Sequence, residues 1–349
     1  MLYICYYSLD ISRSYRRKVL SILTELSSRK AVSTTLSKDN VEKLKTLSKM
    51  RGVPQTKVLD DAVDTLYRKE ESIELQPKHK GIVISIANNK GGVGKTTSAA
   101  AFADLLSKRG FNVLVIDADP QGNLSGRFGY DFSSPDQLRP NYLGNLIKDR
   151  LSDNVIHQPL PYFIEHLAEF PRIDIICSDI RLDDIYAEMN AKGPAGYTVF
   201  RKIINEVRHI DKYDYIIVDS RPAINTEVST LFLGTDYVLI PIEPAFDSVL
   251  GANSMVRFVS KNRELNPGLK ILGVFMTKVK DRTISFHSLL PMVQEGWDKD
   301  LFQTKIPYNQ DVVNAENDGA PVTYRKPVCK ASKAYQKLLD EVVTKIENA

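Results

Sequence analysis

Short runs of apolar, largely β-branched residues alternate with longer helical stretches from Gly81 onward. Runs of four to six residues that lack a regular polar alternation are typical of strands buried on both faces. Helical stretches between such strands indicate βαβ units. The pattern therefore predicts an α/β domain with a doubly wound, mostly parallel sheet. The runs are Ile82–Ile86, Val113–Ile116, Ile173–Ile176, Tyr215–Val218, Tyr237–Ile240 and Ile271–Met276.

The first 80 residues follow a different pattern. Lys30–Leu36 has the composition of a short strand, and Ser37 is a good N-cap for a helix over Lys38–Arg51. Gly52 ends that helix, and Pro54 begins a second helix whose apolar residues keep the 3.6-residue period. This order of strand, helix, glycine and helix resembles a ribbon-helix-helix DNA-binding module. The expected divisions are a helical extension over 1–29, the module over 30–70, a polar linker over 71–80 and the α/β domain over 81–349.

A ribbon-helix-helix module needs two chains, because one short strand gains partners only by pairing with its copy. The paired ribbon would enter the major groove with Ala31, Ser33 and Thr35 toward the bases. Phosphates would be contacted by Lys30 and by the start of the second helix. The alternative is a helical hairpin used only for dimerisation or spacing. The candidate DNA contacts of this module are Lys30, Ala31, Ser33, Thr35, Gln55 and Thr56.

Charge is distributed unevenly along the chain. The net charge of +4 divides into +6 for residues 1–80, with 16 Lys and Arg against 10 Asp and Glu, and −2 for the rest, with 31 against 33. A basic front segment favours a nucleic-acid partner. The three cysteines form no CxxC pair, which argues against a disulfide framework or a cysteine-ligated metal. No apolar run approaches the roughly 18 residues of a membrane span, and Met1–Cys5 lacks a basic segment followed by an apolar stretch, so we expect a cytoplasmic protein.

Strand, glycine-rich turn and helix follow one another between residues 82 and 106, which is the context that a phosphate-binding loop requires. Glycines let backbone N–H groups turn toward phosphate oxygens, and the helix from Lys95 adds its positive end. Lys95 can reach the β and γ phosphates of ATP, and Thr96 offers a hydroxyl to Mg²⁺. The alternative is a glycine turn with a chance Gly-Lys-Thr sequence. The candidate nucleotide-binding residues are Gly91, Gly92, Val93, Gly94, Lys95, Thr96 and Thr97.

The loop contains a second lysine. The usual pattern has glycine at position 89, whereas this chain has Asn89 followed by Lys90. The resulting KGGxGKTT sequence resembles the deviant Walker ATPases of the ParA/MinD family. The resemblance implies that Lys90 reaches across a homodimer to the partner's ATP, where a cation would also offset charge in the transition state. Lys90 and Lys95 are therefore candidate catalytic residues.

Acidic residues follow two of the predicted strands. Asp117–Asn123 matches the DxDPQGN motif of ParA-type partition proteins, and MinD-like proteins differ here. By this resemblance Asp119 would position the attacking water, and Asp117 would support Mg²⁺ through its waters. Asp219 would be the Walker B aspartate near Mg²⁺. Ligands of open α/β sheets bind at the carboxyl ends of strands, which suits these roles. The alternative is that Asp117 and Asp119 merely begin a turn.

The chain departs from the family pattern after Asp219. Arg221 replaces the first of two prolines, and Asn225 replaces a glycine. We expect nucleotide binding to survive, because the phosphate loop is intact, whereas the hydrolysis rate depends on this altered segment.

Softer matches extend the ParA resemblance to about residue 340. They imply that adenine rests near Thr277, Pro307 and Asn309. Family members hold DNA without sequence preference through basic residues near the carboxyl-terminal edge of the dimer, although scattered lysines are more often solvated surface. The candidates here are Lys278, Lys280, Arg282, Arg325, Lys326, Lys330 and Lys333.

These features imply a ParA-type ATPase with ATP and Mg²⁺ as cofactors. It would dimerise on ATP, bind nucleoid DNA and be released by hydrolysis that a ParB-like partner stimulates. A MinD-like membrane positioner would need a basic amphipathic tail, whereas Lys333–Ala349 balances its charges and has the apolar face of a packed core helix. An iron–sulfur ATPase would need paired cysteines. A repressor with a vestigial ATPase would fail to hydrolyse ATP even with DNA and partner.

Overall fold

The chain divides into two units in the computed structural model, residues 1–74 and 75–349. The structure describes residues 38–59, 81–130, 138–152, 156–297 and 299–349, so the expected strand at 30–36, the extension at 1–29 and the linker at 71–80 lie outside the described residues. In the smaller unit α2 spans Lys38–Arg51, as the sequence predicts, and Gly52 follows with a φ of 64°. Residues 55–59 are helical, so the second helix begins directly after Pro54.

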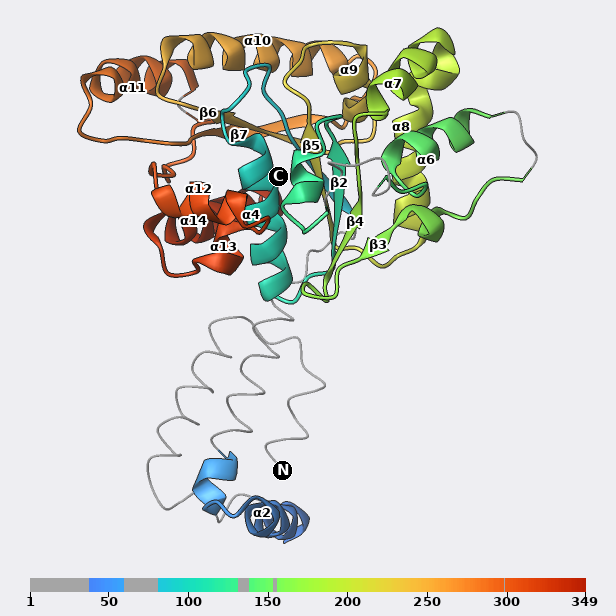
Figure 1. Ribbon diagram of the computed structural model, residues 1–349. Coiled ribbons are helices and arrows are strands. Elements are labelled where there is room, and N and C mark those ends of the chain that lie inside the picture. Colours follow the sequence, from blue (N-terminus) through green and yellow to red (C-terminus); the bar gives the residue numbers. More distant parts are fainter. Residues whose placement is uncertain (1–37, 60–80, 131–137, 153–155, 298) are drawn as a thin grey trace. The chain divides into compact units, whose positions relative to one another are not determined.

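A seven-stranded sheet forms the centre of the larger unit, in the order β3-β4-β2-β5-β1-β6-β7 (Figure 1). Every neighbouring pair of strands is parallel except β3 with β4. This arrangement confirms the doubly wound, mostly parallel sheet expected from the apolar runs. The strands are β1 Ile82–Ile86, β2 Val113–Ala118, β3 Glu165–His166, β4 Ile173–Ile176, β5 Tyr215–Ser220, β6 Tyr237–Ile242 and β7 Lys270–Met276.

Helices cover both faces of the sheet, which is why the central strands are apolar at nearly every position (Figure 1). On one face, α4 packs against β1, β2 and β5, and α14 packs against α4 and β7. On the other face, α6–α8 cover β2, β4 and β5, and α9–α11 cover β6 and β7. The helices are α4 Lys95–Lys108, α5 Asn123–Gly126, α6 Leu143–Leu151, α7 Leu182–Ala191, α8 Pro194–His209, α9 Thr226–Phe232, α10 Phe246–Asn262, α11 Ile284–Trp297, α12 Gln310–Asn317, α13 Val322–Arg325, α14 Lys330–Glu347 and the 3₁₀ helix Leu160–Phe163.

The final helix, α14, belongs to the core. Leu338, Leu339, Val342 and Val343 are buried in the cluster that includes α4, so the packed apolar face expected for this segment is confirmed. Within the described ranges, no helix combines the length and the apolar character needed to cross a bilayer.

The strand order brings three segments together at the carboxyl ends of the central strands β2, β5 and β1. β5 lies between β2 and β1, so Asp219 is in register with Asp117 on one side and with Ile86 on the other. The loop that follows β1 therefore leaves the sheet next to Asp219, and Asp117 lies one strand further away.

Candidate nucleotide-binding site

The loop between β1 and α4 has the backbone of a phosphate-binding turn. Gly92 and Gly94 have φ angles of 76° and 85°, which other residues rarely adopt. Nothing lies within 4 Å of a Cβ built on Gly92, so backbone conformation rather than space requires glycine there. Gly91 and Gly92 are exposed, Val93 is buried, and α4 begins at Lys95. The positive end of α4 therefore adjoins an open glycine turn, which favours an anion.

Lys95 is nearly buried at the start of α4. Its Nζ donates a hydrogen bond to the carbonyl oxygen of Lys90, 3.3 Å away at the opposite end of the loop. Burial lowers the pKa of Lys95, and the carboxylates of Asp219 and Asp119 act in the opposite direction. The Lys90 backbone N–H donates to Asn88 Oδ1 at 3.2 Å. The loop thus closes around one ammonium group that also faces two carboxylates.

Asp219 is fully buried on β5. Its Oδ2 accepts a hydrogen bond from Thr96 Oγ1 at 2.6 Å, whereas its Oδ1 has no hydrogen-bond partner in the part of the chain that the structure describes. Burial, and next the charge of Asp117, raise the pKa of Asp219 to about 8. An unsatisfied carboxylate oxygen beside a threonine hydroxyl fits Mg²⁺, which takes few protein oxygens and completes its shell with water and phosphate.

Asp117 is equally buried but fully engaged. Its Oδ2 accepts hydrogen bonds from the backbone N–H and the hydroxyl of Ser125, both at 2.8 Å, and its Oδ1 accepts from the Asp119 N–H at 3.2 Å. Burial raises the pKa of Asp117 to about 6, although these hydrogen bonds act to lower it. Asp119 is 8% exposed, and its Oδ1 accepts from the Gln121 N–H at 3.0 Å. Asp117 thus shapes the loop that carries Asp119, with a contribution from Ser125 that sequence analysis missed.

Glu316, on α12, is a further site residue that sequence analysis missed. It accepts a hydrogen bond at Oε1 from Thr97 Oγ1. Arg127 donates from Nη1 to the Glu316 carbonyl oxygen at 3.0 Å, and its Nη2 lies 3.4 Å from Glu316 Oε1. A cavity of about 470 Å³ lies between α12 and the segment that follows Asp119. Thr97 and Glu316 are 219 positions apart, and no local signal connects them.

The residues expected near adenine occupy two positions. Thr277 is buried behind the phosphate loop, where its single hydroxyl proton is shared between the carbonyl oxygens of Val93 at 2.8 Å and Ile242 at 3.1 Å. Pro307 pairs with Val279 in an isolated parallel bridge beyond β7. Asn309 is the N-cap of α12. Thr277 thus supports the loop from outside, and the other two residues start the segment that leads to α12.

Lys278, expected on a DNA surface, also lies at the phosphate loop. Its Nζ is 2.5 Å from the carbonyl oxygen of Gly92 and 2.8 Å from Glu243 Oε1. The structure therefore separates Lys278 from the other basic candidates.

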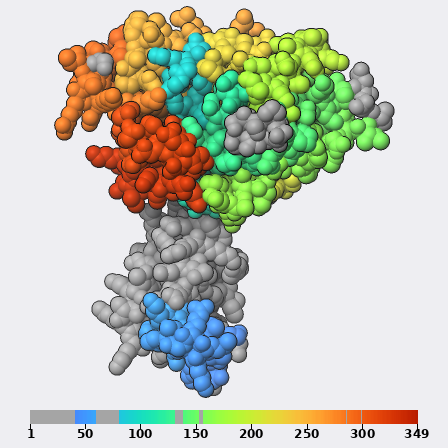
Figure 2. Space-filling model, in the orientation of Figure 1, coloured from blue at the N-terminus to red at the C-terminus, as the bar shows by residue number. Residues whose placement is uncertain are grey.

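The remaining DNA candidates of the larger unit are carried by two different segments. Beyond β7, Lys280 lies 4.5 Å from the ring centroid of Tyr308, and Arg282 is exposed. At α13 and the start of α14, Arg325 lies 3.5 Å from Asp318, and further exposed lysines follow. Helices α12–α14 form one continuous patch in the space-filling view, in red (Figure 2). In this part of the larger unit, the exposed candidates are Lys326, Lys330 and Lys333. In the smaller unit, Gln55 and Thr56 are exposed. The other candidates of the smaller unit, Lys30, Ala31, Ser33 and Thr35, lie outside the described residues.

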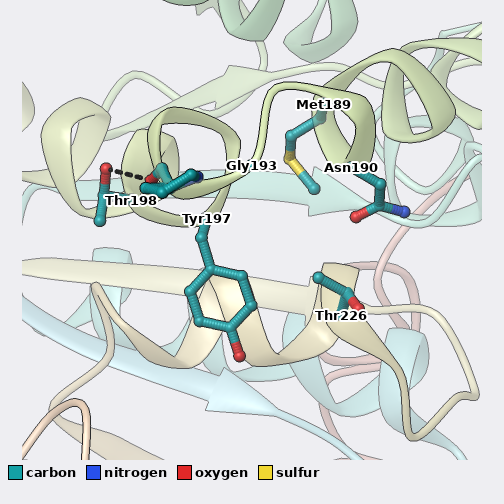
Figure 3. Close-up of a pocket in the computed structure, with 7 residues that line it drawn as sticks. Met189, Asn190, Gly193, Tyr197, Thr198 and Thr226 are labelled. Carbon is teal, nitrogen blue, oxygen red and sulfur yellow. Dashed lines mark hydrogen bonds between the residues drawn. The ribbon is translucent and has the colours of Figure 1, made fainter.

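The segment after Asp219 is held by its two unusual residues. Arg221 Nη1 forms an ion pair with Asp183 Oδ1 on α7 at 2.8 Å. Asn225 caps α9, because its Oδ1 accepts from the Val228 N–H at 3.1 Å. Beside this cap lies a mostly apolar cavity of about 500 Å³ between α7, α8 and the start of α9 (Figure 3). Its lining residues are Met189, Asn190, Gly193, Pro194, Tyr197, Thr198 and Thr226.

The chain is similar to known proteins in sequence and in fold. Residues 81–271 match the family described as AAA domain, and residues 28–69 match the ribbon-helix-helix domain. The chain is 31% identical over 269 residues to an uncharacterised protein of Methanocaldococcus jannaschii, covering 76% of this chain and 100% of that protein. It is 29% identical over 265 residues to the chromosome partitioning protein ParA of Caulobacter vibrioides, covering 75% and 94%. A solved plasmid partition protein of Borrelia burgdorferi, bound to AMPPNP, has a TM-score of 0.62 and 25% identity over 76% of this chain and 99% of that chain.

Proposed function

Because this chain belongs to the ParA-type partition ATPases with an N-terminal ribbon-helix-helix domain, we propose that it segregates DNA through a cycle of ATP-dependent dimerisation. The observation that carries the proposal is the site formed by Lys95, Thr96 and Asp219. It places a nearly buried lysine, a threonine hydroxyl and an unsatisfied carboxylate oxygen beside an open glycine turn.

The phosphate loop would bind ATP through the N–H groups of residues 91–97 and through Lys95. Thr96 and Asp219 would hold Mg²⁺, and Asp117 would support it through its waters. When bound, Mg²⁺ neutralises phosphate charge. Adenine would rest near Pro307 and Asn309, and Thr277 would act by supporting the loop.

Hydrolysis would depend on Asp119, which lies on a loop fixed by Asp117. Asp119 would orient the attacking water, while Lys90 would reach the phosphates of the partner subunit's ATP. A cation supplied in trans makes the nucleotide a bridge between two chains. Dimerisation, and with it the DNA-binding surface of the dimer, would therefore depend on which nucleotide is bound.

DNA would be held without sequence preference by the exposed basic residues of the ATPase unit. The basic groups beyond β7 and at α13–α14 would supply phosphate contacts. Release would follow hydrolysis stimulated by a ParB-like, DNA-bound partner, and we place the protein in the cytoplasm on the nucleoid. The front module would pair with its copy and read an operator or centromere. The residues concerned are Lys280, Arg282, Arg325, Lys326 and Lys330 in the ATPase unit, and Lys30, Ala31, Ser33, Thr35, Gln55 and Thr56 in the front module.

The test combines light scattering with DNA retention, both on the full chain. ATP with Mg²⁺ should change the mass or the hydrodynamic radius and should be required for retention on non-specific duplex DNA. Lys95→Ala should abolish both responses. DNA retention that is independent of nucleotide, with no hydrolysis in the presence of a partner, would identify a repressor with a vestigial ATPase instead.

A further inference from the structure

Two neighbouring residues at the end of β7 contact the outer side of the phosphate loop. Thr277 Oγ1 donates to the Val93 carbonyl oxygen at 2.8 Å, and Lys278 Nζ donates to the Gly92 carbonyl oxygen at 2.5 Å. We propose that Thr277 and Lys278 orient two successive peptide units of the loop, and that Lys278 is thereby a positioning residue for the nucleotide phosphates. This inference rests on the nucleotide site proposed above.

The physical link is the geometry of the peptide unit. In a trans peptide the C=O and the following N–H point in opposite directions, and no cis peptide occurs among the described residues. A donor on the outer side that holds the Gly92 carbonyl therefore turns the Val93 N–H inward. The same relation connects the Val93 carbonyl, held by Thr277, to the Gly94 N–H. These inward N–H groups are the donors that a phosphate-binding loop offers.

Lys278 is itself held in place from two sides. Its Nζ lies 2.8 Å from Glu243 Oε1, and its backbone has a φ of 51°, in the left-handed region that non-glycine residues rarely occupy. Glu243 is fixed in turn, because its N–H donates to Ser248 Oγ in the first turn of α10 at 2.9 Å. A lysine with a free side chain would lose more conformational entropy on contacting the loop. The pair with Glu243 therefore prepares Lys278 for its contact with Gly92.

A cation bound to a carbonyl oxygen also makes the N–H at the other end of the same peptide a stronger hydrogen-bond donor, because hydrogen bonds in a chain polarise one another. Removing the cation should therefore weaken binding of ATP, although Lys95 and the helix terminus remain. Lys278 is about half exposed, with a side-chain exposure of 49%, so solvent screens part of its effect. We expect affinity for ATP to fall about five- to tenfold rather than to disappear.

The competing arrangement has Lys278 leaving Glu243 to contact the phosphates directly. The two arrangements predict opposite effects for Glu243→Gln, which removes the charge and keeps the shape. If Lys278 acts through the loop, losing Glu243 loosens it and weakens ATP binding. If Lys278 contacts phosphate directly, losing Glu243 frees it and strengthens ATP binding.

The experiment is a titration of the full chain with a fluorescent ATP analogue and Mg²⁺. Lys278→Met keeps side-chain length and the same backbone strain, and Lys278→Arg keeps the cation. The first variant should bind about five- to tenfold more weakly, with a matching rise in KM and little change in kcat, and the second should restore most of the affinity. Lys261→Met, which removes an exposed lysine from the last turn of α10, is the matched charge control and should match the wild type.

Glu243→Gln should weaken binding, and the double variant with Lys278→Met should be no weaker than Lys278→Met alone, because both changes disable one contact. Thr277→Val should lower affinity and Thr277→Ser should recover it. Unchanged affinity in Lys278→Met, tighter binding in Glu243→Gln, or multiplicative losses in the double variant would overturn the inference. Lys95→Ala distinguishes failure of this inference from failure of the proposed nucleotide site. If that variant binds ATP normally, the proposed nucleotide site itself is wrong.

Discussion

Asp117 and Asp219 are in register on neighbouring parallel strands, both are fully buried, and they differ in one respect. Both oxygens of Asp117 accept hydrogen bonds from the loop that follows β2, whereas Oδ1 of Asp219 has no partner among the described residues. This difference in hydrogen bonding gives the two aspartates different roles. Asp117 holds the backbone that carries Asp119, and Asp219 keeps an oxygen available for a cation.

The first prediction concerns pH and Asp219. Its pKa of about 8 in the folded chain lies above the ordinary value of 3.8, so the folded state binds the extra proton between these values. The contribution of Asp219 to the stability of the nucleotide-free protein is therefore lost as pH rises from about 4 to about 8. In Asp219→Asn, which stays neutral and can still accept from Thr96, that loss should disappear. Thermal unfolding across this pH range is the measurement, and parallel pH profiles for the two proteins would contradict the shift.

The second prediction separates the two lysines of the loop. Lys90→Ala should leave nucleotide binding largely intact, because Lys95 and the loop N–H groups remain, while ATP-driven closure of the ATPase units is lost. Binding is measured by titration with a fluorescent nucleotide, and closure by light scattering with Mg²⁺ and ATP. Lys95→Ala, which should lose nucleotide binding, is the control. If Lys90→Ala still closes on ATP, its role across the dimer is wrong.

The third prediction concerns Asp119. Asp119→Ala should bind ATP normally but hydrolyse it at least about 100-fold more slowly, because orienting the water serves the transition state rather than the ground state. The complex with DNA should persist correspondingly longer. Single-turnover hydrolysis and DNA dissociation rates measure both effects. Wild-type turnover in this variant would transfer the role to another residue.

The fourth prediction tests the helix cap that replaces the family glycine. Asn225→Ala removes the acceptor for the Val228 N–H and should lower the free energy of unfolding by about 1 kcal/mol. Asn225→Ser, another good N-cap, should recover most of that loss. Chemical denaturation of both variants gives the comparison. Equal stability of the alanine and wild-type proteins would show that the cap does not support α9.

The fifth prediction concerns the front module. Replacing Ser33 and Thr35 with alanine should relax sequence preference while leaving the salt dependence of DNA binding nearly constant. Lys30→Ala should weaken binding to all sequences together, because a phosphate contact carries no sequence information. The measurement is a footprint on the protein's own upstream DNA, at several salt concentrations, with the full chain and with residues 30–69. A module that dimerises but protects no DNA would be an assembly device only.

Much of the fold and part of the site could be predicted from local sequence. Continuous apolar runs predicted the parallel sheet, because only strands covered on both faces tolerate them. The helix at Lys38–Arg51 was predicted by its cap, its period and its terminating glycine. The phosphate loop was predicted for the same kind of reason, since its glycines and lysines act within about ten consecutive residues. In each case the physical cause lies in neighbouring positions.

Tertiary structure alone decided how the site residues are partnered. Thr96 meets Asp219 across 123 positions, Thr97 meets Glu316 across 219, and Lys278 meets Gly92 across 186. Because Lys278 and Gly92 are so far apart in the chain, sequence alone indicates only an exposed basic residue that could bind DNA. The contact between its ammonium group and the phosphate loop becomes visible only in the structure. A local pattern fixes which groups a segment carries and which way its backbone turns. Which distant group satisfies each donor and acceptor depends on how the strands are ordered in the sheet, and that order is not encoded in any single segment.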